Sequence, residues 1–266
     1  MGKRSSYGPG TFCWTDLATT DPDAAKDFYA RLFGWTYTDR PGGVAETYVE
    51  AAVDGDAVAG LYLQPAQQRE GDVPPFWFSY VSVESAERAA ERAADLGGSV
   101  HAEPADVLEA GRLAIVTDPT GAMVGLWEPK GSIGARRVND PGCLTANELS
   151  TNDVGAAIDF YSELFGWRVQ PVDTGDGPPY WLINHDGAAK GQNGGMRELS
   201  PEQLEHGVPP SWLSYFTVSS VDATVAATES AGGLVGPVLD VPAGRIAVLR
   251  DPQGAGFGVF EGDVDD

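Results

Sequence analysis

The sequence repeats itself from end to end, and this duplication constrains the fold more than any other feature. The segment FYARLFGW, Phe28–Trp35, returns as FYSELFGW, Phe160–Trp167, 132 positions later (28 to 160). PPFWFSYVSV returns as PPSWLSYFTV and GRLAIVTDPTG as GRIAVLRDPQG, at shifts of 135 and 133. Because internal repeats indicate similar structural units, the 266 residues predict two related domains.

Each half divides again into two units with the same predicted order: a strand, an amphipathic helix and three strands. In the first unit Asp21 precedes a helix that starts at Pro22, apolar residues recur at the helical period, and Gly34 ends the helix. The segment from Asp153 to Gly166 repeats this pattern. The second and fourth units carry SAERAAERAADLGG and VDATVAATESAGG, each closed by glycine. The predicted fold is therefore α+β, with four βαβββ units, two per domain.

Short segments bounded by glycine and proline predict the strands that follow each helix. In the first half these segments are Tyr48–Val53, Ala57–Leu63, Leu113–Thr117 and Ala122–Glu128. The stretch PKGSIGARRVNDPG has turn-forming residues and no periodicity, which predicts a linker. We expect a first domain at 8–130, a linker at 131–141 and a second domain at 142–262.

The chain is strongly acidic, with 39 acidic and 17 basic residues and a net charge of −22. Such a surface repels phosphate backbones and anionic lipids, so neither nucleic acid nor a membrane is expected as a partner. No apolar run approaches the roughly 18 residues of a membrane span, and no secretory signal is apparent, which predicts a cytoplasmic protein. Cys13 and Cys143 lack metal-site or disulfide spacing and are expected to be free thiols.

The residues resemble a known family. The pattern D-x-x-x-A-x-x-F-Y-x-x-x-F-G-W, with D-P-x-G before a final strand, is similar to the vicinal-oxygen-chelate superfamily of glyoxalases, extradiol dioxygenases and bleomycin-type resistance proteins. The resemblance extends from about Thr11 to Glu261, and the two-domain layout is similar to actinobacterial glyoxalase-like proteins. It implies sheets that curl into clefts. In metal-dependent members it also implies one metal ligand on the first strand and one on the last strand of each unit.

At these ligand positions the sequence carries no metal donors. The first-strand positions fall on Trp14, Phe78, Ala146 and Leu213, and the last-strand positions on Gly125 and Gly258 and near Gly60 and Gly195. Glu128 and Glu261 end the last strands, but alternation turns them to the opposite face. Divalent metals need several converging His or carboxylate donors, and the chain has only three histidines. We therefore predict no metal centre and no cofactor.

Strand alternation from the ligand positions assigns the residues that face the clefts. The predicted ligand-binding residues are Trp14, Phe78, Tyr80, Met123, Trp127, Leu213, Tyr215 and Phe260. Asp16 and Glu148 are the predicted acid/base residues, because a carboxylate in an apolar cleft either pairs with a cation or has its pKa raised. Aromatic walls beside glycines predict a wide cavity suited to a planar ligand.

Three functional hypotheses follow. The first is a metal-independent small-molecule binding protein, which sequesters or carries a planar aromatic compound, with a cationic group as one option. The second is a glyoxalase-like, lyase-like or secondary-metabolism enzyme that uses a cleft carboxylate. The third is a structural module whose aromatic side chains fill the cleft. A monomer and a homodimer both fit four units in one chain. Arg112 and Arg245 are expected to pair with surface carboxylates rather than to bind an anion.

Overall fold

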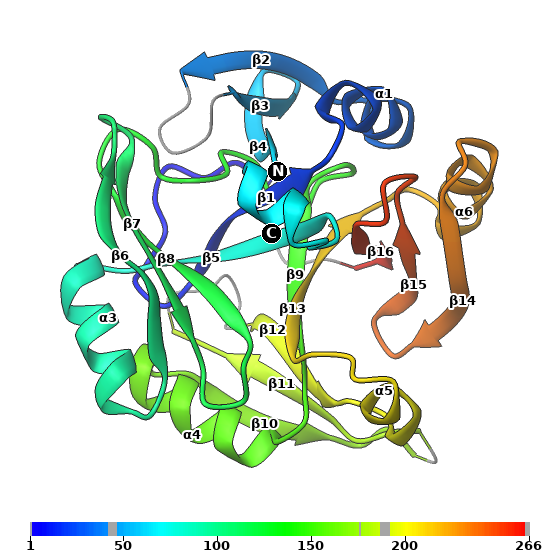
Figure 1. Ribbon diagram of the computed structural model, residues 1–266. Helices are drawn as coiled ribbons and strands as arrows, with labels where there is room; N and C mark the ends of the chain where they lie inside the picture. Colours follow the sequence, from blue (N-terminus) through cyan, green and yellow to red (C-terminus); the bar gives the residue numbers. More distant parts are fainter. Residues whose placement is uncertain (1, 42–46, 176, 187–191, 264–266) are drawn as a thin grey trace.

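The computed structural model describes residues 2–41, 47–175, 177–186 and 192–263. Each half of the chain forms one curled, eight-stranded mixed sheet with helices on one side (Figure 1). The predicted α+β class and the predicted repetition of βαβββ units are confirmed. None of the described helices has the length and apolar content needed to cross a bilayer.

The two halves contain the same elements in the same order. The first half contains β1 (Phe12–Thr19), α1 (Pro22–Phe33), β2 (Thr36–Pro41), β3 (Thr47–Val53), β4 (Asp56–Leu63), α2 (Ala66–Glu70), β5 (Phe76–Ser82), α3 (Ala86–Asp95), β6 (Ser99–Val107), β7 (Gly111–Thr117) and β8 (Met123–Pro129). The second half contains β9 (Leu144–Thr151), α4 (Val154–Phe165), β10 (Arg168–Val172), β11 (Tyr180–Asn184), β12 (Gln192–Glu198), α5 (Pro201–Glu205), β13 (Ser211–Thr217), α6 (Val221–Ser230), β14 (Leu234–Val241), β15 (Gly244–Arg250) and β16 (Gly256–Gly262). The short helices α2 and α5, which join the units, were not predicted.

The first strands of the two units meet at the centre of each sheet. The first sheet has the order β2-β3-β4-β1-β5-β8-β7-β6, and the second has the corresponding order β10-β11-β12-β9-β13-β16-β15-β14. Strands β1 and β5 are antiparallel neighbours, and each pairs in parallel with the last strand of its own unit. The first and last strands of a unit therefore lie side by side, which sets the geometry of the site.

Local capping interactions fix the first helix where the sequence predicts it. The Asp21 side chain accepts a hydrogen bond of 3.0 Å from the backbone N–H of Ala24, and Pro22 occupies the first turn. Gly34 ends the helix in a left-handed conformation with φ of 71°, which glycine adopts without steric cost. Asp153 and Gly166 do the same for α4. The helix boundaries are thus encoded locally in both halves.

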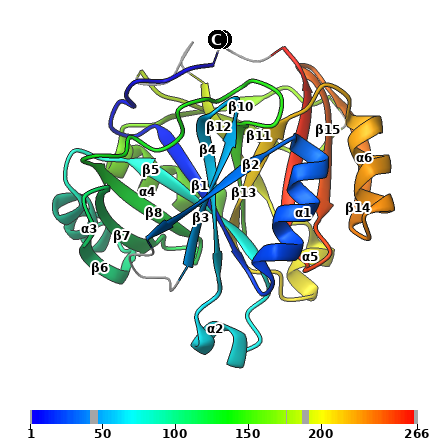
Figure 2. The ribbon, with the colours of Figure 1, turned by 90° about the horizontal axis from the view of Figure 1, so that it is seen from above.

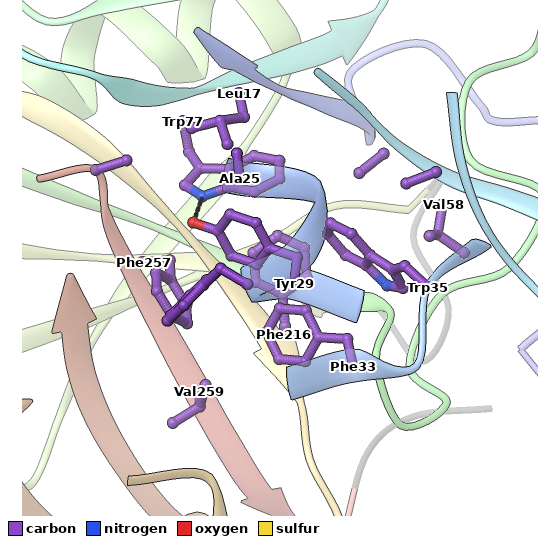
Figure 3. Close-up of a cluster of buried hydrophobic side chains, with 14 of the residues drawn as sticks. Leu17, Ala25, Tyr29, Phe33, Trp35, Val58, Trp77, Phe216, Phe257 and Val259 are labelled. Atoms are coloured by element: carbon purple, nitrogen blue, oxygen red, sulfur yellow. Dashed lines mark hydrogen bonds between the residues drawn. The ribbon is translucent and has the colours of Figure 1, made fainter. Parts of the chain in front are cut away.

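The two halves share their hydrophobic cores. The side chains of Tyr29, Phe33 and Trp35 pack on the first sheet and also against Phe216 and Phe257 of the second half (Figure 3). The rings of Tyr29 and Phe257 have centroids 5.5 Å apart. A second core joins α4 to the sheet and helix of the second unit. Accordingly, α1 lies near α6 and α3 lies near α4 in both ribbon views (Figures 1 and 2).

Two groups of charged side chains behave as the sequence predicts. The Glu128 carboxylate accepts a hydrogen bond from the backbone N–H at the start of α3, and Glu261 does so at the start of α6, so both lie on the helical side of the sheets. Arg112 pairs with Glu87 and Asp106, and Arg245 pairs with Asp222. The prediction that both arginines pair with surface carboxylates is confirmed.

Candidate functional site

The side of the first sheet that faces away from the helices carries a cluster of aromatic residues, which we call the first inner face. It consists of Trp14, Asp16, Phe78, Tyr80 and Trp127. Phe78 and Tyr80 form a buried cluster against the half-buried Trp14 and Trp127. Leu17, Val81 and Leu126, at alternate positions of the same strands, lie in the two cores with the helices. The structure therefore brings these five predicted residues together on one face.

Asp16 lies at the centre of this face and is 6% exposed. Its Oδ1 atom accepts hydrogen bonds of 2.6 Å from Trp14 Nε1 and 2.6 Å from the Tyr48 hydroxyl. Trp14 Nε1 also lies 2.9 Å from the Tyr48 oxygen, so the three side chains form a closed triangle. Tyr80 provides a further hydrogen bond to the carboxylate. The hydrogen-bond donors to this buried carboxylate are thus all neutral groups.

The electrostatic environment of Asp16 makes its ionisation costly. Burial raises the pKa of the Asp16 carboxyl to about 6, against the opposing effect of the hydrogen bonds from Tyr48, Tyr80 and Trp14. Every group that sets this pKa is uncharged, and within the described part of the chain no cation forms an ion pair with Asp16. Asp16 is therefore a buried carboxylate with hydrogen-bond donors but no counter-ion.

The glycines at the predicted last-strand ligand positions lie beside these groups, as the parallel pairing of first and last strands requires. Gly60 pairs with Asp16, and Gly125 pairs with Tyr80. A Cβ atom at Gly60 would overlap Asp16 Oδ1 and the Tyr48 hydroxyl, and one at Gly125 would overlap the Tyr80 ring. The glycines accommodate tyrosine rings instead of opening the wide cavity that the sequence suggested. The physical reason is that a neighbouring ring occupies the space that each missing side chain leaves.

The residues present do not fit a metal ion of the family type. The first-strand positions hold indole, phenyl and aliphatic groups, and at the last-strand positions Asp16 and the tyrosines fill the volume that a ligand side chain would need. Across the described ranges, no three His, Cys, Asp or Glu side chains gather where they could hold an ion. Divalent metals require such convergence. The residues of the inner faces therefore provide no site for a metal ion of this type.

The second sheet presents an equivalent surface, the second inner face, which consists of Ala146, Glu148, Leu213, Tyr215 and Phe260. Tyr215 is buried, whereas the other four residues are half-buried. The antiparallel pairing of β13 with β9 sets Leu213 opposite Glu148 and Tyr215 opposite Ala146. The predicted residues of the second half therefore also share one face.

Glu148 differs from Asp16 in its partners. Its Oε1 atom accepts hydrogen bonds of 3.2 Å from Arg197 Nε and 3.4 Å from the Tyr215 hydroxyl, and Tyr180 provides another. Burial raises the pKa of the Glu148 carboxyl, and the Arg197 charge opposes that effect. The second inner face thus holds an ion pair where the first holds an uncompensated acid.

The sequence did not single out Tyr48, Tyr180 or Arg197. The repeat itself contains a signal for the tyrosines, because Tyr48 and Tyr180 are 132 positions apart, the same shift that relates Asp16 to Glu148. Met123, a predicted ligand residue, lies at the start of β8, is 39% exposed and is not part of the aromatic cluster. It is placed at the edge of the face and not at its centre.

Two surface cavities are lined by residues outside the two inner faces. One, of about 310 Å³, is lined by the start of α3 together with Leu164 and Phe165 at the end of α4. The other, of about 290 Å³, is lined by Arg40, Glu50 and residues between β8 and β9, including Arg136. None of the predicted site residues lines either cavity, so a ligand of the inner faces must contact their half-buried side chains.

Comparisons with known proteins agree with the fold. Residues 11–126 match the family model described as Glyoxalase/Bleomycin resistance protein/Dioxygenase superfamily, and residues 146–260 match that of a glyoxalase-like domain. The chain is 41% identical over 267 residues to the putative glyoxylase CFP32 of Mycobacterium tuberculosis, with 98% of each chain covered. It is 35% identical over 270 residues to the anthracycline biosynthesis protein DnrV of Streptomyces peucetius, with 96% of this chain and 94% of that one covered.

Solved structures with the same fold include a glyoxalase and a dioxygenase. An Mn(II)-bound glyoxalase from Novosphingobium aromaticivorans superposes with a TM-score of 0.66 at 14% identity, over 97% of this chain and 85% of that one. The 2,3-dioxygenase LapB from Pseudomonas sp. KL28 gives a TM-score of 0.66 at 14% identity, over 98% and 95%. At this identity the similarity establishes the fold and carries no residue roles.

Proposed function

The chain belongs to the glyoxalase, bleomycin-resistance and dioxygenase superfamily, and from this premise we propose that it is a metal-independent binding protein for a planar aromatic compound with a cationic group. The observation that carries the proposal is the environment of Asp16. Its carboxylate lies on an aromatic face, accepts hydrogen bonds from neutral donors and has no cation partner among the described residues. A ligand cation would supply the missing counter-ion.

The surroundings of Asp16 support a planar ligand. Trp14 and Trp127 are half-buried, so part of each indole remains available for contact with an aromatic ring. Stacking on such rings and cation–π attraction both favour a flat cation over an aliphatic one. Phe78 and Tyr80 are packed beneath and hold the face in place. Recognition would then depend on ring contact and on one charge, without coordination chemistry.

The names of the relatives agree with this ligand class. Two of them, from Streptomyces species, are named anthracycline biosynthesis proteins. Anthracyclines contain fused planar rings, which belong to the shape class that an aromatic face accommodates. This agreement supports a planar ligand. The cationic group of the ligand is inferred from the environment of Asp16 alone.

A second candidate function is proton transfer by Asp16 on a bound compound of the same class. It is favoured by a pKa of about 6, since a general acid or base works best when its pKa lies near the working pH. Simple binding predicts that the ligand is recovered unchanged. Catalysis predicts a product, a rate profile with an inflection near pH 6 and loss of turnover in Asp16→Asn.

The binding proposal can be tested with 9-aminoacridine, a planar fluorescent cation, in buffer treated to remove metals. The native protein should bind it saturably, and Asp16→Asn should weaken binding at least tenfold because the counter-charge is lost. Asp95→Asn, at the exposed end of α3, removes the same charge from the surface and controls for general attraction to an acidic protein. Equal affinities for the three proteins would contradict the proposal.

A further inference from the structure

The two inner faces are related by the duplication, yet the second carries smaller side chains at four corresponding positions. Trp14, Phe78, Met123 and Trp127 of the first half correspond to Ala146, Leu213, Gly256 and Phe260 of the second. Each replacement reduces side-chain volume. An aromatic cluster separate from the two shared cores forms on the first face, and none forms on the second among the described residues. The second face is therefore the less filled of the two.

The faces also differ in charge at one corresponding position. Tyr62 on β4 is replaced by Arg197 on β12, two residues beyond Gly195 and so on the same face. Tyr62 lies near Asp16, and Arg197 bonds to Glu148. A neutral phenol beside an acid in the first half thus becomes a guanidinium beside an acid in the second.

Part of the Arg197 guanidinium remains available. Its side chain is 35% exposed, whereas the Glu148 side chain is 12% exposed, so the cation is the more accessible member of the pair. Only Nε contacts Glu148, and within the described ranges the two terminal amino groups have no assigned partner. Because Glu148 accepts a bond at Nε, it restrains the side chain without using the paired amino groups that bind carboxylates and related anions.

From these differences we propose that the second inner face is a separate binding site for an aromatic compound that carries an anionic group, with Arg197 binding the anion. The smaller side chains at Ala146 and Leu213 leave the face open to the ring, and the guanidinium provides the only charge complementary to an anion in this cluster. The two halves would then select ligands of opposite charge. This inference uses residues of the other half and does not depend on the proposed function.

The test uses anthraquinone-2-sulfonate as the anionic probe and 2-(hydroxymethyl)anthraquinone as its neutral counterpart, measured by equilibrium dialysis. The native protein should bind the sulfonate at least tenfold more tightly than the neutral compound, despite its overall negative charge. Arg197→Met should remove this preference. Arg250→Met, which removes an exposed arginine at the end of β15, should leave it unchanged.

The Glu148→Gln variant separates a binding role of Arg197 from a structural one. It removes the competing carboxylate and leaves the guanidinium in place, so affinity for the sulfonate should rise several-fold. The double variant Glu148→Gln/Arg197→Met carries no unpaired buried charge and should fold, yet show no preference for the anion. The inference is overturned if the native protein has no preference for the sulfonate or if Arg197→Met keeps that preference. It is also overturned if Glu148→Gln lowers the affinity for the sulfonate.

Occupancy of the two faces can be measured together. Saturating 9-aminoacridine should not displace anthraquinone-2-sulfonate, because the probes bind different halves. Loss of 9-aminoacridine binding alone would contradict the proposed function and leave this inference standing. Displacement of one probe by the other would contradict the assignment to separate faces.

Discussion

The hydroxyl of Tyr29 in the first half donates a hydrogen bond of 3.1 Å to the carboxylate of Asp251 in the second half. The same hydroxyl accepts a bond of 3.0 Å from Trp77 Nε1, and all three side chains are buried. In the other core Tyr161 accepts from Trp212 and lies beside Asp118. The FY and D-P-x-G motifs, which are far apart within each half, therefore meet across the interface between the halves.

Removal of this contact should destabilise the whole chain. Tyr29→Phe leaves Trp77 Nε1 without an acceptor and Asp251 Oδ2 without its donor, while Asp251 Oδ1 keeps its bonds from backbone N–H groups. We therefore expect the free energy of unfolding to fall by about 1–3 kcal/mol. Tyr37→Phe, which loses a single, partly buried bond to a backbone carbonyl, should cost less. Urea unfolding followed by circular dichroism measures both variants. Equal losses of unfolding free energy in the two variants would contradict a larger contribution from the bonds of Tyr29.

The shared cores predict that neither half is stable alone. Residues 8–130 expressed separately would expose the aromatic residues of α1 that contact Phe216 and Phe257. We expect this fragment to self-associate or to lack a cooperative unfolding transition, and to recover one when mixed with residues 142–262. Sedimentation velocity and thermal unfolding provide the measurements. A monomeric fragment as stable as the full chain would contradict the prediction.

The raised pKa of Asp16 predicts how stability depends on pH. The carboxyl titrates near pH 6 in the folded chain and near 3.8 when unfolded, so between these values the native state binds more protons. Stability from this group is therefore greatest at acidic pH and falls as pH rises through that window, by an amount on the order of 3 kcal/mol. Asp16→Asn should lack this loss. The difference in unfolding free energy between native and variant, measured at pH 4.5 and 7.5, isolates the effect, and a constant difference would contradict it.

The same titration predicts the opposite trend for binding. Affinity for 9-aminoacridine, which stays cationic over this range, should rise as pH increases through 6, because the ligand requires ionised Asp16. The ionised fraction of a carboxyl with a pKa of about 6 rises about tenfold between pH 5 and 7, and the affinity should rise by the same factor. Isothermal titration calorimetry at several pH values measures it. A flat profile in the native protein would show that Asp16 is not the counter-ion.

Two glycines in β16 test whether tyrosine rings occupy the space beside the last strand. A Cβ atom at Gly258 would overlap the Tyr215 ring, whereas one at Gly256 would make only ordinary contacts with Leu213 and Leu249. Gly258→Ala should therefore lower the free energy of unfolding by about 1–3 kcal/mol. Gly256→Ala, in the same strand, should be nearly neutral. Similar stability of the two variants would argue against the packing described here.

Most of the fold could be predicted from local patterns. The cap at Asp21, the proline after it and the glycine at 34 specify a helix without reference to the rest of the chain, and the duplication then predicts its partner. Strand alternation likewise placed Asp16 and Tyr80 on one face. These features depend on neighbours in sequence, which is why the sequence reveals them.

The interior of the site was harder to predict. A glycine such as Gly125 leaves either a cavity or room for a neighbouring ring, and only the register of β5 with β8 shows that Tyr80 fills it. Tyr48 keeps the shift of 132 positions that relates Asp16 to Glu148, but only the register of β3 with β4 places its hydroxyl beside the carboxylate. Arg197 corresponds to Tyr62 at a shift of 135, because the chain segments before these two residues differ in length. The sharing of cores between halves also depends on tertiary packing that no local pattern encodes.

The most direct test of the account is a crystal structure of the protein grown with 9-aminoacridine in the presence of Mn²⁺. The account predicts the acridine ring against Trp14 and Trp127, with its cationic nitrogen within hydrogen-bond distance of the Asp16 carboxylate and no ion held by side chains of either inner face. An ion coordinated by inward-pointing oxygen or nitrogen atoms, or a probe bound away from Asp16, would contradict it.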